Sequence, residues 1–432
     1  MIPLTDYIGS NVFVREVPMS IATTKLQDAF KENVIWDQDV RYFHAMIKYP
    51  SWTKTTDIFK FLHKKSIKKL RKNPKLFYVL DASTEGFSTI YNNTPFFDIL
   101  YFNCKKYKIP PKKIIFFSSN MVDEENLIRF NTENKIEESI NVCCFHNFEH
   151  MLFGLKDYSA IYNMNLPNIR GYDIRHHNLV NKLVNDRYLE ALKHSKRFYY
   201  GEKYFLSLSR VPRPHRILSA YDLFNSDIFD KGIVSCGPIP KNHPTPHFIQ
   251  GLPKNHGISL EQLQKFRKQL PLVADTEDFD TNHAMSLHSH LHWSTLFQVV
   301  GETFTEDWYG TSRFWSEKTF RAIFHMEPFI IWGQPNANRN LEKYGYKLYD
   351  TMFDYDSFDS EQDTVKRWHK LLKVIKGRVK YLNSLDKQQH LQWKFKEQEV
   401  LRHNYKVMYC NENTRTVMSD LSLKLKAIID DA

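Results

Sequence analysis

A short polar segment between two apolar runs constrains the fold of this chain more than any other feature. The segment is SEKTF at 316–320, and the flanking runs are FQVVGET at 297–303 and EPFIIWG at 327–333. Both runs have the length and residue types of buried strands, whereas residues 319–326 carry apolar side chains at helical spacing. A β-helix-β unit is therefore predicted, in which Ser316 is the N-cap of the helix.

The start of this helix predicts a binding site for an anion. A helix N-terminus presents free backbone N–H groups and the positive end of the helix dipole. Lys318 can contact a diphosphate there, and Glu317 can accept hydrogen bonds from ribose hydroxyls. The pair therefore favours a nucleotide over a bare phosphate.

Length and composition indicate a packed protein of two domains. The chain has 432 residues, of which 42% are hydrophobic and 15% aromatic, too many for a disordered protein. Its five cysteines are scattered without a C-x-x-C pair, which is typical of reduced thiols. No apolar run approaches the roughly 20 residues that cross a bilayer, and the N-terminus lacks the pattern of a secretory signal. We expect a cytoplasmic protein without membrane insertion.

Positive charge is concentrated in one predicted helix. The net charge is +11, and the stretch from Lys54 to Lys75 contains nine Lys or Arg residues against the single acid Asp57. Its lysines recur at helical spacing opposite apolar residues, so one face is strongly basic. The lysines of this face are Lys64, Lys65, Lys68, Lys69 and Lys72. Such a face can be merely solvated, but the overall excess of base favours contact with a polyanion, DNA in particular.

Alternation of strands and helices predicts an α/β fold. Strands are expected at 75–83 and 203–210, and a turn followed by a strand at 109–120, with helices between them; repeated βα units imply a mostly parallel sheet. A domain boundary near residue 200 separates two Rossmann-like domains, 1–200 and 201–432. In open sheets of this kind the strand C-termini face the functional crevice, which places Asp81 and Glu85 there in the first domain.

Two further elements are expected late in the second domain. The segment YGYKLYD at 344–350 is expected to be a strand. Ser360 resembles the first residue of a capping box, and apolar residues then follow at spacings of three and four from Val365 to Leu382. A long amphipathic helix is therefore predicted there.

A second group of candidate ligand residues follows the strand at 203–210. Arg210, Arg213, His215 and Arg216 lie within seven residues, in a turn stiffened by prolines. These groups repel one another unless an anion or acids intervene, and a diphosphate is the simplest partner. The alternative is that one or two of these arginines pair with acids of the other domain.

Several short motifs, in order, resemble a family of glycosyltransferases. FLSLSR-x-PRPHR is followed by LP with Asp275, VVGET, SEKTFRAI, PFI-x-x-G, LEKYGYKLYD and FDYDSFD. This order is similar to a group common in large DNA viruses and phages, whose C-terminal half is like that of fucosyltransferase-like enzymes of the GT-B fold. DASTEG at 81–86 and IPPKKIIF at 109–116 resemble the N-terminal half of the group. The chain departs from the pattern in an insertion, Gly333–Asn340.

The resemblance implies two Rossmann-like domains facing across a cleft, with the sugar donor in the C-terminal one. It places Glu317 on the donor ribose, Lys318 and Arg210 on the diphosphate, and Glu302 near the nucleotide. Arg213 and Arg216 are added as donor-binding candidates from their position. Glu85, or less favoured Asp81, would deprotonate the acceptor hydroxyl if the reaction is inverting. A UDP-sugar is expected in preference to a GDP-sugar.

No metal or other cofactor is expected. Asp354 and Asp356 form a D-x-D sequence, but GT-B enzymes stabilise the leaving diphosphate with cations and a helix dipole. The histidines at 283, 288, 290 and 292 lack neighbouring cysteines and zinc-like spacing.

The acceptor remains open at this stage. The basic helix favours DNA, with 5-hydroxymethylcytosine in phage DNA as the preferred acceptor. The alternatives are a glycan or lipid-linked saccharide, or a non-catalytic nucleic-acid-binding protein of the same fold. The sugar, the base, the stereochemical outcome and the oligomeric state also stay open.

Overall fold

The structure is a computed structural model of the whole chain, and its contacts divide it into two units. It describes residues 2–7, 10–18, 41–46, 56–59, 62–82, 90–91, 94–144, 177–238, 252, 255–274, 289–306, 313–410 and 427–428. Unit 1 comprises Met1–Gly171, Asp307–Phe314 and Asn411–Ala432, and unit 2 comprises Tyr172–Glu306 and Trp315–Cys410. The chain therefore passes between the units four times.

Unit 1 is built on a six-stranded sheet in the order β1-β2-β3-β4-β7-β8. Its strands are β1 (Ile2–Tyr7), β2 (Ser10–Pro18), β3 (Arg41–Met46), β4 (Leu76–Ala82), β7 (Ile114–Ser118) and β8 (Asn141–Cys144). The pairs from β3 to β8 are parallel, whereas β1 and β2 extend the sheet in antiparallel fashion. The α/β architecture expected for this region is confirmed.

Four helices and a small hairpin complete the described part of unit 1. They are α2 (Lys64–Lys72), α3 (Phe96–Tyr107), the 3-10 helix η1 (Pro111–Lys113), α4 (Asp123–Asn134), and β5 (Ile90–Tyr91) paired with β6 (Thr94–Pro95). The core forms between α2, α3 and the sheet, from residues such as Leu70, Phe96, Leu100 and Phe116. At the end of β7, Asn120 Oδ1 accepts a hydrogen bond from the backbone N–H of Arg313 at 2.7 Å.

Unit 2 is built on a four-stranded sheet in the order β10-β9-β11-β12, and every described pair in it is parallel. Its strands are β9 (Phe205–Ser209), β10 (Gly232–Cys236), β11 (Phe297–Gly301) and β12 (Phe329–Trp332). The side chains on both faces of these strands are largely buried and mostly apolar, as is usual for parallel sheets. This arrangement is compatible with a Rossmann-like fold.

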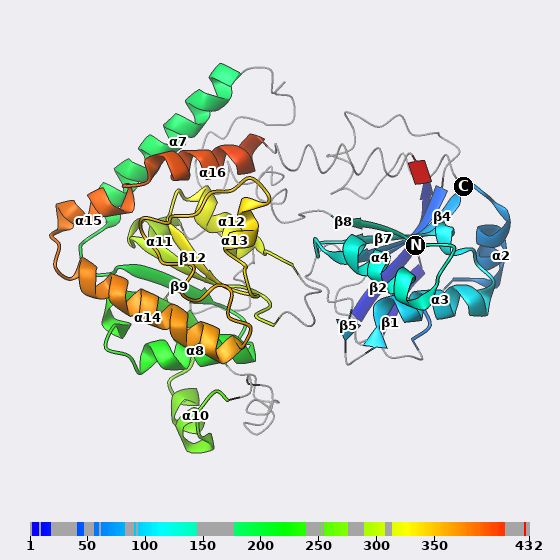
Figure 1. Cartoon of the computed structure of the whole chain (residues 1–432), viewed down its shortest axis with the longest axis horizontal. Coiled ribbons are helices and arrows are strands. Elements are labelled where there is room, and N and C mark those ends of the chain that lie inside the picture. The colour runs from blue at the N-terminus through cyan, green and yellow to red at the C-terminus, as the bar shows by residue number, and fades with distance from the viewer. Residues whose placement is uncertain are drawn as a thin grey trace. The chain divides into compact units, whose positions relative to one another are not determined.

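Helices cover both faces of the second sheet (Figure 1). The described helices of unit 2 are α7 (His177–Phe198), α8 (Pro214–Phe224), η3 (Phe229–Lys231), α10 (Leu260–Arg267), α11 (Ser289–Trp293), α12 (Glu317–Phe324), α13 (Arg339–Glu342), α14 (Thr364–Leu382), α15 (Lys387–Lys394) and α16 (Gln398–Cys410). Figure 1 shows α12 and α16 on one side of the sheet and α8 and α14 on the other. On the second side, Trp368 of α14 donates to Asp222 of α8 at 2.8 Å.

Helix α7 belongs to unit 2, whereas the boundary expected at residue 200 assigned it to the first domain. Its side chains explain the difference. Arg187 donates through Nε to the carbonyl of Phe324 at 3.1 Å, and the ring of His194 stacks on Trp293 with centroids 4.2 Å apart. The helix therefore packs on α11 and α12, which follow it in the sequence and belong to unit 2.

Two local expectations were wrong. Residues 344–350 do not form a strand. Both the N–H and the carbonyl of Lys347 are hydrogen-bonded by the side-chain amide of Asn404 in α16. That amide takes the place of a neighbouring strand. The long helix α14 is present, but its N-cap is Asp363, whose side chain accepts from Lys366 N at 2.8 Å, rather than Ser360.

A buried ionic cluster lies at the edge of the second sheet where β11 and β12 begin. Glu327 accepts hydrogen bonds from His292 Nδ1 at 2.6 Å and Thr295 Oγ1 at 2.8 Å. Lys394 Nζ donates to the carbonyls of His292 and Thr295, both at 2.7 Å. Lys394 is 1% exposed and Glu327 is fully buried. Burial raises the pKa of Glu327 to about 7, although Lys394 and Thr295 oppose the shift.

The raised pKa of Glu327 predicts a dependence of stability on pH. A carboxyl that binds its proton more tightly when folded stabilises the protein fully below its ordinary pKa of 4.5, and this contribution is lost as pH rises through about 7. We expect Glu327→Gln to flatten the fall in unfolding free energy between pH 4.5 and 7. Urea titrations of both proteins at several pH values measure this, with Glu399→Gln on the surface of α16 as the matched control. An unchanged slope would contradict the assignment.

Candidate anion site at the switch point of the second sheet

The predicted β-helix-β unit is present as β11, α12 and β12. Helix α12 begins at Glu317, directly after the N-cap Ser316, whose hydroxyl accepts from Lys318 N at 3.4 Å. Lys318 Nζ also donates to Ser316 Oγ at 3.0 Å and to Glu317 Oε1 at 2.8 Å. Glu317 and Lys318 thus form an ion pair on the first turn of the helix.

Glu302 fixes the start of α12 from the end of β11. Its Oε1 accepts from Ser316 N at 3.1 Å and from Thr319 Oγ1 at 2.6 Å, while Oε2 accepts from Thr303 N at 3.1 Å. The residue is 1% exposed. The carboxylate predicted to lie near the nucleotide is therefore engaged within the protein, where it satisfies backbone and hydroxyl donors at the helix N-terminus.

The cationic turn after β9 lies against the same loop. His215 Nε2–H donates to the carbonyl of Glu302 at 2.9 Å, and Arg216 Nη2 donates to that carbonyl at 3.3 Å. Arg213 Nη1 donates to the carbonyl of Thr303 at 3.4 Å. Residues 86 to 90 positions apart in sequence are therefore joined. Arg210 follows the last residue of β9 directly and is partly exposed.

Sheet topology explains why these residues meet. β9 has β10 on one side and β11 on the other, so the connections that follow β9 and β11 lead in opposite directions across the sheet. In open α/β sheets this switch in direction creates a crevice at the strand C-termini, where ligands bind. Arg210 comes directly after the C-terminal residue of β9, and Glu302 comes directly after that of β11.

Neighbouring charges keep the first turn of α12 ionised. Burial by itself would raise the pKa of Glu317, but Lys318 and Arg321 outweigh it and hold that pKa at about 2. Burial lowers the pKa of Lys318, although Glu317 opposes the shift. Glu317 is therefore a carboxylate at neutral pH, able to accept hydrogen bonds but not to donate one.

Three cations surround His215. Burial and the charges of Arg216, Arg213 and Lys318 together hold its pKa well below the ordinary value, so the imidazole is neutral at pH 7. Burial also lowers the pKa of Arg216 to about 10. Arg216 is 4% exposed, and its buried Nε has no hydrogen-bond partner in the described part of the chain. A buried guanidinium N–H without an acceptor is costly unless a ligand supplies one.

The insertion after β12 is tied to the strand it follows. Asn338 donates through Nδ2 to the carbonyl of Ile331 at 3.0 Å and accepts from the N–H of the same residue at 2.9 Å. Asp359 in turn accepts from Asn338 Nδ2 at 2.7 Å and from Arg339 N at 2.9 Å. The inserted residues therefore form a fixed cap on the edge of β12.

The possible metal ligands have other roles where the structure describes them. Asp354 accepts from Ser357 N at 3.3 Å, and Asp356 pairs with Arg339 at 2.9 Å. His292 is bonded to Glu327, as described above. Among the described residues, no group of three or more His, Cys, Asp or Glu side chains is arranged to hold a metal ion.

The predicted catalytic acids of unit 1 can be placed only in part. Asp81 is the sixth residue of β4 and lies at its C-terminal end, but its side chain is outside the described residues, as is all of Glu85. At the end of the neighbouring strand β7, Asp123 accepts from Ser118 Oγ and from Asn120 Nδ2, both at 2.6 Å. All three residues are buried, so this network holds the turn between β7 and α4.

The predicted basic helix is confirmed as α2. Its lysines at 64, 65, 68, 69 and 72 are all exposed, while Ile67 and Leu70 are buried on the opposite face.

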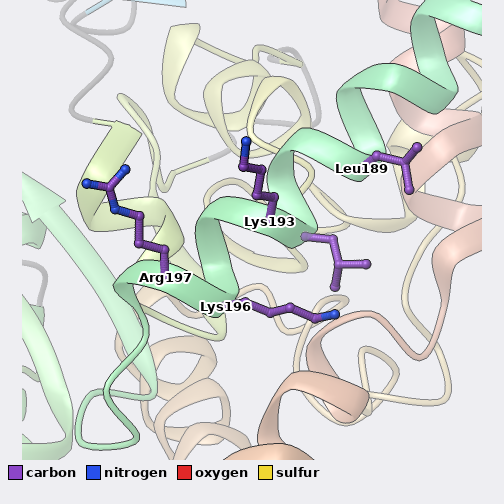
Figure 2. Close-up of a pocket in the computed structure, with 5 residues that line it drawn as sticks. Leu189, Lys193, Lys196 and Arg197 are labelled. Atoms are coloured by element: carbon purple, nitrogen blue, oxygen red, sulfur yellow. The ribbon is translucent and has the colours of Figure 1, made fainter.

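A shallow pocket lies apart from these residues, on the surface of α7. It is lined by Leu189, Leu192, Lys193, Lys196 and Arg197. Figure 2 shows the cationic side chains of this helix turned outward rather than converging on one point. Nothing in the pocket can orient a substrate, and we assign no function to it.

Two contributors to the anion site were not singled out from the sequence. Arg321 lies one helical turn after Glu317 and helps to lower its pKa. Thr319 binds the carboxylate of Glu302. The i, i+4 spacing of Glu317 and Arg321 was a usable signal. The bond of Thr319 to Glu302 depends on the tertiary fold, so no sequence signal pointed to it.

Comparisons with known proteins give no identification. No family model, no curated protein and no solved structure matches this chain. Within the described part of the chain, none of the helices combines the length and the apolar character that a bilayer crossing requires.

Proposed function

We propose that the protein is a glycosyltransferase of the GT-B type, which moves a sugar from a nucleotide diphosphate donor to an acceptor hydroxyl. Unit 2 would hold the donor and unit 1 the acceptor. The observation that carries the proposal is the buried Arg216 at the switch point, with an unpartnered Nε and with Arg213 and Lys318 close enough to act on the same histidine.

Each residue of the site has a distinct role in this proposal. Lys318, Arg216 and Arg213 would neutralise the diphosphate, whose negative charge grows as the glycosidic bond breaks. Glu317, held as a carboxylate, would accept hydrogen bonds from the ribose hydroxyls. Arg210, which the family resemblance places on the diphosphate, would add a fourth cation there. Glu302 would act indirectly, because it fixes the backbone that presents Glu317 and Lys318.

The chemistry at the acceptor rests on the position of two acids at the end of a predicted strand, on the basic helix and on the family resemblance. Glu85, or alternatively Asp81, would remove the proton of the acceptor hydroxyl in an inverting reaction. The preferred donor is a UDP-sugar and the preferred acceptor is 5-hydroxymethylcytosine in DNA.

The proposal predicts a mass change in a defined acceptor. The protein is incubated with duplex DNA containing 5-hydroxymethylcytosine and a panel of UDP- and GDP-sugars, and the digested nucleosides are analysed by mass spectrometry. We expect a mass increase of one sugar with one donor. Slow hydrolysis of a donor without transfer would retain the glycosyltransferase and direct the search for the acceptor to glycans. Neither transfer nor hydrolysis with any donor would refute the proposal.

A further inference from the structure

The strongest feature of unit 1 outside the proposed chemistry is a continuous basic surface on α2 and its neighbours. Helix α2 has the sequence KKSIKKLRK, with six cations among nine residues and no acid. All six side chains are exposed. Among the described residues, none of the five lysines forms an ion pair with an acid, and the nearby Asp57 pairs instead with Lys106 at 2.6 Å.

The basic surface extends beyond α2 to the end of α3. Arg71 donates through Nε to the carbonyl of Tyr107 at 2.6 Å, so the C-terminal ends of the two helices lie side by side. Lys113 of η1, which follows α3, donates to the carbonyl of Pro74, which follows α2. The segments after the two helices are therefore also in contact. This brings the exposed Lys105 and Lys108 next to the cations of α2. We call the lysines of α2 together with Arg71, Lys105 and Lys108 the basic surface.

The charge pattern on α2 works against the stability of the helix itself. Lys64 and Lys68, Lys65 and Lys69, and Lys68 and Lys72 are like charges four residues apart, which repel. The first turn lacks an acid, although the helix dipole favours one there. A polyanion laid along the helix would turn this repulsion into attraction.

The apolar side chains of α2 restrict the kind of partner. Ile67 is 7% exposed and Leu70 is fully buried in the core of unit 1, and no large apolar side chain of the helix is exposed. An interfacial membrane helix inserts its apolar face among the lipids, which α2 cannot do. A helix of nine residues is about 13 Å long. It can therefore follow the phosphates of a nucleic-acid backbone.

We propose that the basic surface binds the phosphate backbone of duplex DNA, through α2 and the adjoining end of α3 together. This inference names the macromolecular partner of the proposed enzyme and rests on that proposed function for the role of DNA as acceptor. The binding itself is electrostatic and needs no base-specific contact.

Salt dependence of DNA binding tests the proposal. We measure binding of the full-length protein to a fluorescent duplex of 24 base pairs by anisotropy, at several salt concentrations. Each phosphate contact makes the slope of log Kobs against log salt more negative by about 0.9, so six contacts give a slope of about −5. Changing Lys64, Lys65, Lys68 and Lys69 to Gln should reduce the magnitude of the slope by about 3.6 and weaken binding at least roughly 100-fold at 0.1 M salt.

Two further variants make the test specific. Lys105→Gln with Lys108→Gln should reduce the magnitude of the slope by about 1.8, if the end of α3 takes part. The matched control changes Lys366, Lys373 and Lys380 to Gln, three exposed lysines spaced along α14 of unit 2. It should leave both slope and affinity unchanged. An equal loss in the control would show attraction by net charge alone and overturn the proposal.

The remaining outcomes are separable from a failure of the proposed function. Donor hydrolysis should persist in every lysine variant, and loss of hydrolysis together with DNA binding would mean that α2 is structural. Binding to vesicles containing phosphatidylserine, with none to the duplex, would overturn the inference in favour of a membrane surface. DNA binding with the predicted slopes, but without hydrolysis of any donor, would retain the basic surface and refute the glycosyltransferase.

Discussion

Lys394→Met is expected to lower the free energy of unfolding by about 3 to 5 kcal/mol, because it removes one partner of a buried charge cluster. The ammonium group of Lys394 donates to two buried carbonyls and lies close enough to Glu327 to lower its pKa. Methionine fills a similar volume but leaves the two carbonyls without a donor, and loss of the nearby cation raises the pKa of Glu327 further, so that its carboxyl takes up a proton. Urea unfolding at pH 7 measures the loss.

A double variant separates lost charge pairing from lost packing. Adding Glu327→Gln to Lys394→Met removes the ionisable partner of Lys394, so the double variant should lose less than the sum of the two single losses, and a double-mutant cycle quantifies the difference. Lys387→Met at the exposed start of the same helix is the matched control and should change stability by less than about 0.5 kcal/mol. A loss below about 1 kcal/mol in Lys394→Met would mean that water already reaches the cluster.

Lys318→Ala is expected to weaken binding of UDP by about 1.5 to 3 kcal/mol, or roughly 10- to 150-fold, through loss of a charge-assisted contact to the diphosphate. Because the change also leaves Glu317 without its partner, thermal unfolding must be followed in parallel. Titration calorimetry with UDP and GDP gives the affinities and tests the preferred nucleotide. Equal affinity for UDP in the variant and the parent protein would refute the role of Lys318.

A conservative variant of Lys318 and a variant far from the site serve as controls for this measurement. Lys318→Arg keeps the charge and should retain most of the affinity, although the longer side chain changes the geometry. Lys373→Ala on the exposed face of α14 removes a lysine of unit 2 without touching the site and should leave binding unchanged.

The sequence predicted the elements of the anion site because their signals are local. β11, α12 and β12 follow from apolar runs and an N-cap serine, and the cations after β9 lie within one turn. What the sequence missed depends on tertiary contacts. Asn404 replaces a strand partner for Lys347, from 57 residues away. The carboxylate of Glu302 is occupied at the start of α12, whereas the motif alone suggested a ligand contact.

The same distinction applies to the rest of the chain. Helix α2 could be predicted with its basic face because charge periodicity is read directly from the sequence. Its continuation at Lys105 and Lys108 could not, because it depends on the bond from Arg71 to Tyr107, 36 residues away. The assignment of α7 likewise depends on contacts with Phe324 and Trp293, which lie beyond the next domain's first strands.

The interlaced course of the chain limits how this protein can be dissected. Residues Asp307–Phe314 leave unit 2 and belong to unit 1. There the backbone N–H of Arg313 donates to the side-chain Oδ1 of Asn120 at 2.7 Å, and the carbonyl of Arg313 accepts from the backbone N–H of Met121 at 3.0 Å. A cut at any single position between Met121 and Glu317 therefore separates this segment, or part of it, either from its partners just after β7 or from α12, whose first turn begins three residues after Phe314. The proposed donor-binding and acceptor-binding roles should therefore be studied by paired point substitutions in the intact chain, since a fragment cut in that interval would divide a segment that the chain shares between the two units.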